Sequence, residues 1–250
     1  MYLTKSRFKI GISCPTKLYY ESNSQQFDNN DDVNEFMKAL AAGGLQSGEL
    51  AKLYYPGGIE IDGSSKEEQV NQTSTALKQE NVIIYEAAIK VGHKFIRVDI
   101  LEKKGRIIKA IEVKSKSCDG VDEMQFLNTS NKIQSGDRPY LEDIAFQYLV
   151  CLEAFPDCDV IPYLMMPDKQ IKCSVDGLYS QFVIKKEKHR DKCRVVEGIT
   201  KNDLGIQIMS AVNVKNTVEI LINDDYYRQH PDFGGRSFKA IIAWFVELLV

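Results

Sequence analysis

Two acidic residues and one lysine stand out in the apolar, strand-forming stretch between positions 96 and 115. Asp99 lies in the middle of one apolar run, while Glu112 and Lys114 are two residues apart in the next. Side chains two residues apart in a strand share a face. Paired carboxylates bind a hard divalent cation through oxygen, and a nearby lysine offsets negative charge on a phosphate. These residue types predict metal-assisted hydrolysis of a phosphodiester bond.

Three strands must position these side chains. The segments with alternating apolar and polar residues are Val82–Val91, Lys94–Glu102 and Arg106–Lys114. Short turns join them, so they predict a three-stranded meander. A two-residue loop at Lys104-Gly105 would place Asp99 opposite Ala110 and diagonal to Glu112, within side-chain reach. A one-residue slip in this register would separate the two carboxylates. The alternative interpretation of the three residues is a solvated sheet face with a cross-strand salt bridge.

The rest of the chain predicts further helices and strands around this meander. Thr4 is typical of a helix N-cap, and Pro15 breaks or restarts that helix. We expect helices over 33–40, 45–55, 62–80, 141–155 and 238–250, and strands over 160–166 and 217–223. Gly43-Gly44 separates the predicted helices over 33–40 and 45–55. This order of elements is typical of an α/β or α+β fold.

Composition excludes several classes of protein. The chain has 250 residues and a formal net charge of −3, which argues against a protein that coats nucleic acid with its whole surface. No apolar run reaches the roughly 18–20 residues of a membrane span, and the N-terminus lacks the apolar core of a secretory signal. The six cysteines include no C-x-x-C pair, which disfavours a compact zinc ribbon and favours reduced thiols in the cytoplasm.

A known family shares this pattern. Asp99 followed by Glu112-Val113-Lys114 resembles the D…(D/E)-x-K core of the PD-(D/E)XK nuclease superfamily. The flanks resemble RecB-like exonucleases and CRISPR-associated RecB-like nucleases. They are the Cys-Pro and Leu-Tyr-Tyr of residues 3–21, the segment GGLQSGELAKLYYPGG, and a glutamine in the helix after the core. These features follow the order of the family and span roughly residues 1–155.

The resemblance implies a restriction-endonuclease-like core, with a central mixed β-sheet flanked by helices. We expect a nuclease-like domain over residues 1–200 and a C-terminal extension over residues 201–250. This extension either packs on the core or begins a further region of a longer protein.

The resemblance also implies a cation site for Mg²⁺ or Mn²⁺. Asp99 and Glu112 would bind the cation, and the carbonyl of Val113 would add a ligand. The family often has a metal-binding histidine in the upstream helix, where this chain has Gly48 followed by Glu49. Glu49 either replaces that ligand or is a solvated helix residue.

Two further residues take catalytic roles from the resemblance. Lys114 would be the catalytic lysine, and Gln147 would position the substrate or the lysine. Asp143 lies one helical turn before Gln147 and is its expected partner; a buried polar group without a catalytic role is the alternative. Where the family often has a tyrosine, four residues beyond the glutamine, this chain has Cys151.

Some relatives carry an iron–sulfur cluster held by cysteines. Cys14 fits the first ligand position of that cluster. Cys158, Cys173 and Cys193 match only by their location, because their spacings of 15 and 20 residues differ from the family pattern. We therefore do not expect an iron–sulfur cluster.

Local basic residues would contact the DNA backbone. The first group, which we expect beside the proposed site, comprises Lys103, Lys104, Arg106 and Lys109. A second charged segment, residues 185–194, is more simply explained as a solvated loop.

The sequence thus predicts a metal-dependent nuclease that hydrolyses DNA, with exonuclease-like action. One alternative is a non-catalytic nucleic-acid-binding or assembly module on the same fold. Another is an endonuclease of the restriction or junction-resolving type. We expect DNA as the partner, together with further domains or protein partners, and no membrane partner.

Overall fold

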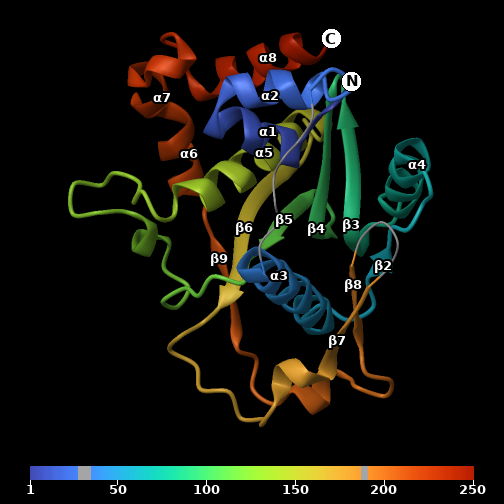
Figure 1. The fold of residues 1–250 in the computed structure, drawn as a ribbon. Helices are drawn as coiled ribbons and strands as arrows, with labels where there is room; N and C mark the ends of the chain where they lie inside the picture. Colours follow the sequence, from blue (N-terminus) through green and yellow to red (C-terminus); the bar gives the residue numbers. More distant parts are fainter. Residues whose placement is uncertain (28–34, 187–190) are drawn as a thin grey trace.

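A mixed β-sheet runs through the molecule, and helices cover its faces (Figure 1). The structure is a computed structural model that describes residues 1–27, 35–186 and 191–250. In these ranges seven strands form the sheet in the order β2-β3-β4-β5-β6-β9, and β1 also pairs with β4. The strands are β1 (Leu3–Thr4), β2 (Ile59–Glu60), β3 (Asn81–Val91), β4 (Lys94–Lys104), β5 (Ile107–Val113), β6 (Asp159–Pro167) and β9 (Met209–Asn213), with a separate hairpin of β7 (Phe182–Lys185) and β8 (Lys192–Val195). The prediction of an α/β fold with a central mixed sheet is confirmed.

The helices begin and end largely where sequence signals predict. They are α1 (Lys5–Ser13), α2 (Pro15–Ser22), α3 (Glu35–Tyr54), α4 (Lys66–Ala76), α5 (Arg138–Ala154), α6 (Lys215–Asn223), α7 (Tyr226–Gln229) and α8 (Phe238–Leu249). The Thr4 side chain accepts a hydrogen bond from the Arg7 N–H, so the predicted N-cap is confirmed. Pro15 is the first residue of α2, where its missing N–H costs no helical hydrogen bond. No helix in the described ranges is long and apolar enough to cross a membrane.

The β4–β5 hairpin differs from the prediction in its register. Lys104 pairs with Ile107, so the two-residue loop is Gly105-Arg106 rather than Lys104-Gly105. Gly105 takes a positive φ of 55°, which glycine adopts without steric cost. Continuing this register places Asp99 across from Glu112 instead of Ala110. A shift of two residues leaves each side chain on the same face of the sheet. Asp99, Glu112 and Lys114 therefore still share a face, although the predicted register is wrong.

A gap in the sheet lies beside Asp99. β3 pairs with one edge of β4 from Lys94 to Lys104, except at Asp99. On the other edge β1 pairs only with the start of β4, at Lys94 and Phe95, and β5 begins to pair at Ile100. Asp99 lies between these two partners, and Lys5 is the first residue after β1. The gap therefore leaves space for the start of α1 beside the middle of β4.

Strand β3 changes its facing beside Asp99. Glu86, across from Asp99 on β3, has a positive φ of 56°, which is uncommon for a residue other than glycine. Ile84 and Ala87 both lie in the larger hydrophobic core, although they are three residues apart. A strictly alternating strand would put them on opposite faces. The positive φ of Glu86 and the break in alternation around it mark locally strained backbone. Such strain clusters at functional sites.

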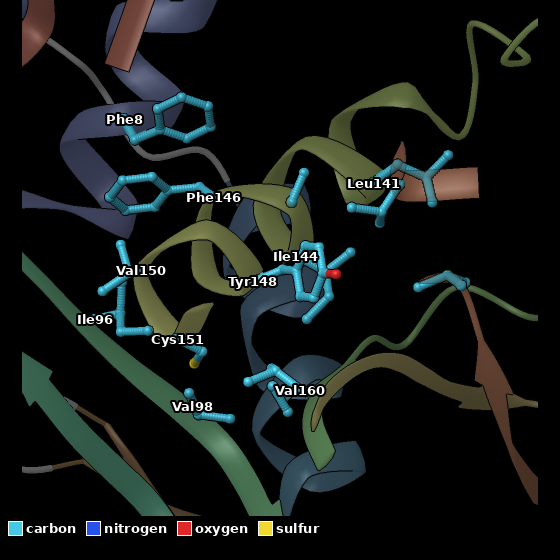
Figure 2. Packing of buried hydrophobic residues seen from close by; sticks show 14 of the residues in the cluster. Phe8, Ile96, Val98, Leu141, Ile144, Phe146, Tyr148, Val150, Cys151 and Val160 are labelled. Atoms are coloured by element: carbon cyan, nitrogen blue, oxygen red, sulfur yellow. The ribbon is translucent and has the colours of Figure 1, made fainter. Parts of the chain in front are cut away.

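Helix α5 crosses over the sheet between the parallel strands β5 and β6. Its apolar residues pack on the face of the sheet that carries Ile108 and Ala110. In Figure 2, Cys151 of α5 lies above Val98 of β4. This placement directs other α5 side chains toward the end of β5.

Helix α3 covers the opposite face of the sheet. Its residues Leu50 and Ala51 pack with Ile100 and Ile111 in a second core cluster. The helix continues through Gly43-Gly44, where the sequence predicted a break. Tertiary packing outweighs the roughly 1 kcal/mol that each glycine costs in a helix. The predicted helix over residues 33–40 lies partly outside the described residues.

The predicted strand over residues 217–223 is wrong, because this segment belongs to helix α6. Its threonine, valine and isoleucines favour a strand intrinsically. Val218, Leu221 and Ile222 are nevertheless buried with helical spacing, in the core that they share with α5 and α8. Packing in the tertiary structure therefore decides the conformation of this segment.

The segment after residue 200 contributes to the same core as the start of the chain. β9 pairs antiparallel with β6, and Phe238 and Phe245 of α8 lie against Phe8 of α1. Phe8 in turn stacks on Phe146, with ring centroids 4.6 Å apart (Figure 2). A β-carbon added at Gly11 would lie 2.6 Å from the Phe245 ring. β9 and α8 therefore pack on the core.

We expect Phe245→Ala to lower the free energy of unfolding by about 3–5 kcal/mol, because it leaves a cavity under α1. Urea denaturation followed by circular dichroism would measure this change. Leu152→Ala is the matched control, since Leu152 is 37% exposed on α5. Equal midpoints for the two variants, or a separate early transition for α8, would contradict a shared core.

Candidate functional site

Glu112 is the most enclosed acid of the predicted motif. Its side chain is 2% exposed, and it faces α5 from the end of β5. Its Oε1 accepts hydrogen bonds from Lys5 and Lys114, each at 2.8 Å. Its Oε2 accepts from Lys5 at 2.9 Å and from the amide of Gln147 at 2.7 Å. Three elements, α1, β5 and α5, therefore meet at one carboxylate.

Lys114 joins Glu112 to a second buried acid. Its Nζ lies 2.5 Å from Oδ2 of Asp143, which is 1% exposed on α5. Lys9, one turn after Lys5 on α1, lies 3.3 Å from the same oxygen. Asp143 thus contacts Lys114 through its side chain, and only its backbone carbonyl accepts from Gln147. The expected contact between Gln147 and Asp143 is therefore a long hydrogen bond of 3.4 Å, from Nε2 of Gln147 to the backbone carbonyl of Asp143.

Asp99 completes the cluster from the gap beside β4. Its Oδ2 accepts a hydrogen bond of 2.8 Å from the Val113 N–H, and its Oδ1 lies 3.7 Å from Nζ of Lys5. Its side chain is 25% exposed, so this acid has access to solvent. The structure therefore brings Asp99, Glu112 and Lys114 together, as the spacing predicts.

The charges of the cluster shift the pKa values in opposite directions. Burial and the carboxylate of Glu112 raise the pKa of Asp99 to about 7, against the influence of Lys5. Burial also disfavours the charge of Glu112, but Lys5 and then Lys114 hold its pKa below the ordinary value. Burial likewise opposes the charge of Lys114, yet Glu112 and Asp143 hold its pKa above the ordinary value. Lys114 is therefore a cation at neutral pH.

Two buried oxygen atoms in the cluster lack a donor. Oδ1 of Asp143 and Oε1 of Gln147 have no hydrogen-bond partner among the described residues. Buried polar atoms in proteins are nearly always satisfied by protein, water or an ion. Both unsatisfied atoms are acceptors, so the site is suited to a water molecule or a cation.

The cluster fits a divalent cation with few protein ligands. The position of the Lys5 ammonium shows that one positive charge can lie near Glu112 and Asp99 at the same time. Both ligands are carboxylates, the hard oxygen donors that Mg²⁺ prefers, and Mg²⁺ commonly uses only one or two of them. In the described ranges no group of three or more His, Cys, Asp or Glu side chains is placed to hold a metal ion.

Two of the predicted metal ligands are not shown in that role. Glu49 pairs with Lys52 at 3.0 Å, on α3 and across the sheet from Glu112. A ligand at this position would have to reach around the sheet, so the structure does not bring Glu49 to the cluster. Val113 is adjacent to the site, where its N–H, rather than its carbonyl, contacts Asp99.

The predicted DNA-contacting lysines and arginine lie at the hairpin turn and not beside the site. Lys104 is about 17 Å along β4 from Asp99, at 3.3–3.4 Å per residue. Lys104 and Lys109 both pair with Glu102. Lys103 donates to the carbonyls of Leu77 and Gln79, and Arg106 to that of Asp157. The expected proximity is therefore wrong, because the strand separates the turn from the acids.

The second basic segment forms part of the β7–β8 hairpin, in which Lys185 pairs with Lys192. Residues 187–190 of that segment lie outside the described residues. The six cysteines are free thiols. Cys14 lies between α1 and α2, while Cys173 is an exposed thiol after β6 and Cys193 belongs to β8.

Sequence reasoning missed two residues of the site, Lys5 and Lys9. Both belong to α1 and both contact an acid of the cluster. Their spacing of four residues places them on one face of the predicted helix. Two lysines on one face of the predicted N-terminal helix were the signal that could have indicated them.

Stability should depend on pH through Asp99. Because the folded protein holds the proton of Asp99 more tightly than the unfolded chain does, this contribution to stability is complete at low pH. It is lost as the pH rises from 3.8 to about 7. We therefore expect Asp99→Asn to gain stability relative to the wild type across this range, in urea denaturation with a metal chelator.

Asp225→Asn is the control for this comparison, since the Asp225 side chain is 64% exposed. Its stability relative to the wild type should change little with pH. A difference between Asp99→Asn and the wild type that is constant over the range would contradict the raised pKa.

Comparison with known proteins gives no family for the chain. No family model, no curated protein and no solved structure matches it.

Proposed function

We propose that this protein is a metal-dependent nuclease that hydrolyses phosphodiester bonds of DNA. One observation supports the proposal above all: Asp99, Glu112 and Lys114 converge at the gap in the sheet. Two carboxylates able to share one cation, with a lysine beside them, suit phosphoryl chemistry.

The fold supports a place in the PD-(D/E)XK superfamily. An antiparallel meander, β3-β4-β5, is followed by the crossover helix α5 and the parallel strand β6. This arrangement fits the restriction-endonuclease-like core that the motif resembles. The resemblance of residues 3–21 and 43–58 to the flanks of RecB-like nucleases supports DNA as the substrate and exonuclease-like action.

Asp99 and Glu112 would hold Mg²⁺ or Mn²⁺, and the cation would supply Lewis-acid polarisation of the scissile phosphate. The Val113 N–H holds Oδ2 of Asp99, and Nε2 of Gln147 holds Oε2 of Glu112. These hydrogen bonds fix the orientation of the carboxylates before the substrate arrives. Gln147 thus acts as a positioning residue for Glu112.

Lys114 acts as a fixed positive charge. Glu112 and Asp143 hold its pKa above the ordinary value, so it keeps its proton at neutral pH. Asp143 holds the ammonium group through Oδ2. In this position Lys114 offsets the negative charge that develops on the phosphate in the transition state.

A non-catalytic nucleic-acid-binding module is the second candidate. One observation favours it: Lys5 bridges Asp99 and Glu112, so the acids are neutralised without any metal ion. A protein that had lost catalysis could keep such a cluster as a structural ion network. The two candidates differ in whether purified protein cleaves DNA.

We expect the wild type to cleave linear DNA in the presence of Mg²⁺ or Mn²⁺ and to stop when a chelator is added. Asp99→Asn and Lys114→Met should each lower kcat by roughly 10²-fold or more. The first removes an anionic ligand of the cation, and the second removes the positive charge beside the phosphate. Gel assays with linear single-stranded, linear double-stranded and circular DNA would measure this, and uncut circles would indicate an exonuclease.

Glu49→Gln and Lys104→Ala are the controls for this assay, because the structure places both residues away from the cluster. They should retain nearly full activity. Cleavage that survives both Asp99→Asn and Lys114→Met would refute the site, and folded wild type without cleavage would favour the binding module.

A further inference from the structure

The carboxylate of Glu112 has no acceptor position left for a cation. An ionised carboxylate has about four lone-pair sites. In this structure four donor contacts fill them: two from Lys5, one from Lys114 and one from Gln147. Binding of a divalent cation by Glu112 therefore requires that one of these donors leaves.

Lys5 is the most exposed of these donors. Gln147 is fully buried in α5, and Lys114 is 13% exposed and anchored a second time by Asp143. Lys5 is 27% exposed, and its only other acid within 4 Å among the described residues is Asp99. A lysine has a long flexible stem and a well-hydrated ammonium group. Lys5 can therefore move into solvent without disturbing the core.

The charge of the cluster also favours an exchange. Three carboxylates, Asp99, Glu112 and Asp143, face three ammonium groups from lysines 5, 9 and 114. The formal sum is zero. Adding a divalent cation to all three lysines would leave a net charge of +2 in a largely buried space, which is electrostatically costly. The departure of Lys5 reduces that excess.

We propose that Lys5 is a displaceable counter-ion that occupies the cation position of the site and leaves it when a divalent cation binds. This inference rests on the proposed function, because it assumes that Asp99 and Glu112 bind the cation. Lys5 stabilises the metal-free protein by pairing the acids, and it weakens the affinity for the cation by competing with it.

The backbone around Lys5 suits this role. β1 and the N-cap Thr4 hold the main chain, since β1 pairs with β4 and Thr4 caps α1. Only the side chain of Lys5 needs to move. The freed ammonium group stays at the rim of the site, within the reach of its own stem.

Binding of Mn²⁺ alone tests the proposal without any assay of cleavage. We would measure the Kd for Mn²⁺ by electron paramagnetic resonance of the free ion, for full-length wild type, Lys5→Met and Asp99→Asn. We expect Lys5→Met to bind Mn²⁺ roughly tenfold more tightly than the wild type, because a charge-assisted contact no longer competes. Asp99→Asn should bind more weakly than the wild type.

Lys9→Met is the matched control. It removes the same charge from the cluster, but Lys9 contacts Asp143 and leaves the acceptors of Glu112 filled. We expect a clearly smaller gain in affinity than for Lys5→Met. Lys5→Arg, which keeps the charge at the site, should gain no affinity.

A thermal melt provides a second readout. Without metal, Lys5→Met should melt below the wild type, because it leaves the acids unpaired. Saturating Mn²⁺ should then raise its Tm by more than it raises that of the wild type. If Lys5→Met does not fold, Lys5→Gln makes the same comparison with a neutral hydrogen-bond donor.

The outcomes separate this inference from the proposed function. Equal gains in Mn²⁺ affinity for Lys5→Met and Lys9→Met, or no gain for Lys5→Met, would overturn the displacement of Lys5. The proposed cation site would remain. Absence of Mn²⁺ binding in the wild type and in every lysine variant would overturn the cation site itself. A larger gain for Lys5→Met, lost when Asp99→Asn is added, would support both.

Discussion

The arrangement of this molecule depends on one buried carboxylate. Glu112 is 2% exposed, and an ionised group at that depth is tolerated only when charges and hydrogen bonds surround it. Its donors come from three elements that are distant in sequence: Lys5 on α1, Lys114 after β5 and Gln147 on α5. The N-terminal helix, the meander and the crossover helix must therefore meet at the end of β5. Removing one donor would leave a buried acceptor unpaired, so the ion network and the fold constrain each other.

The same network accounts for how an almost neutral protein would carry the proposed site for a phosphate ester. The formal net charge of −3 excludes a broadly basic surface. In the site, however, lysines balance the acids one for one, and the exchange of Lys5 for a divalent cation would make the cluster positive. Attraction of a phosphate would then depend on local charge in a partly buried space, where electrostatic interactions are stronger than at the surface. The bulk charge of the chain says little about such a site.

Several elements could be predicted from local patterns, and others could not. The alternation in β3, β4 and β5 indicated the meander, and the apolar repeat of α5 indicated a buried helix. The register of the hairpin was wrong by two residues, because glycine suits the first position of the observed loop as well as the second of the predicted one. Helix α6 was predicted as a strand, because its β-branched residues carry a preference that packing against α5 overrides.

The sequence by itself determined which residue types could perform chemistry and which of them share a strand face. The shared face of Glu112 and Lys114 follows from their spacing, since alternation in a strand is a local property of the backbone. Asp99 lies on this face in the predicted hairpin register and in the observed one. Only the tertiary structure decided what surrounds them. Lys5 enters through a gap in the sheet, Asp143 reaches Lys114 from α5, and Glu49 stays across the sheet. These contacts join residues up to 107 positions apart, and no local pattern specifies which distant segments pack together.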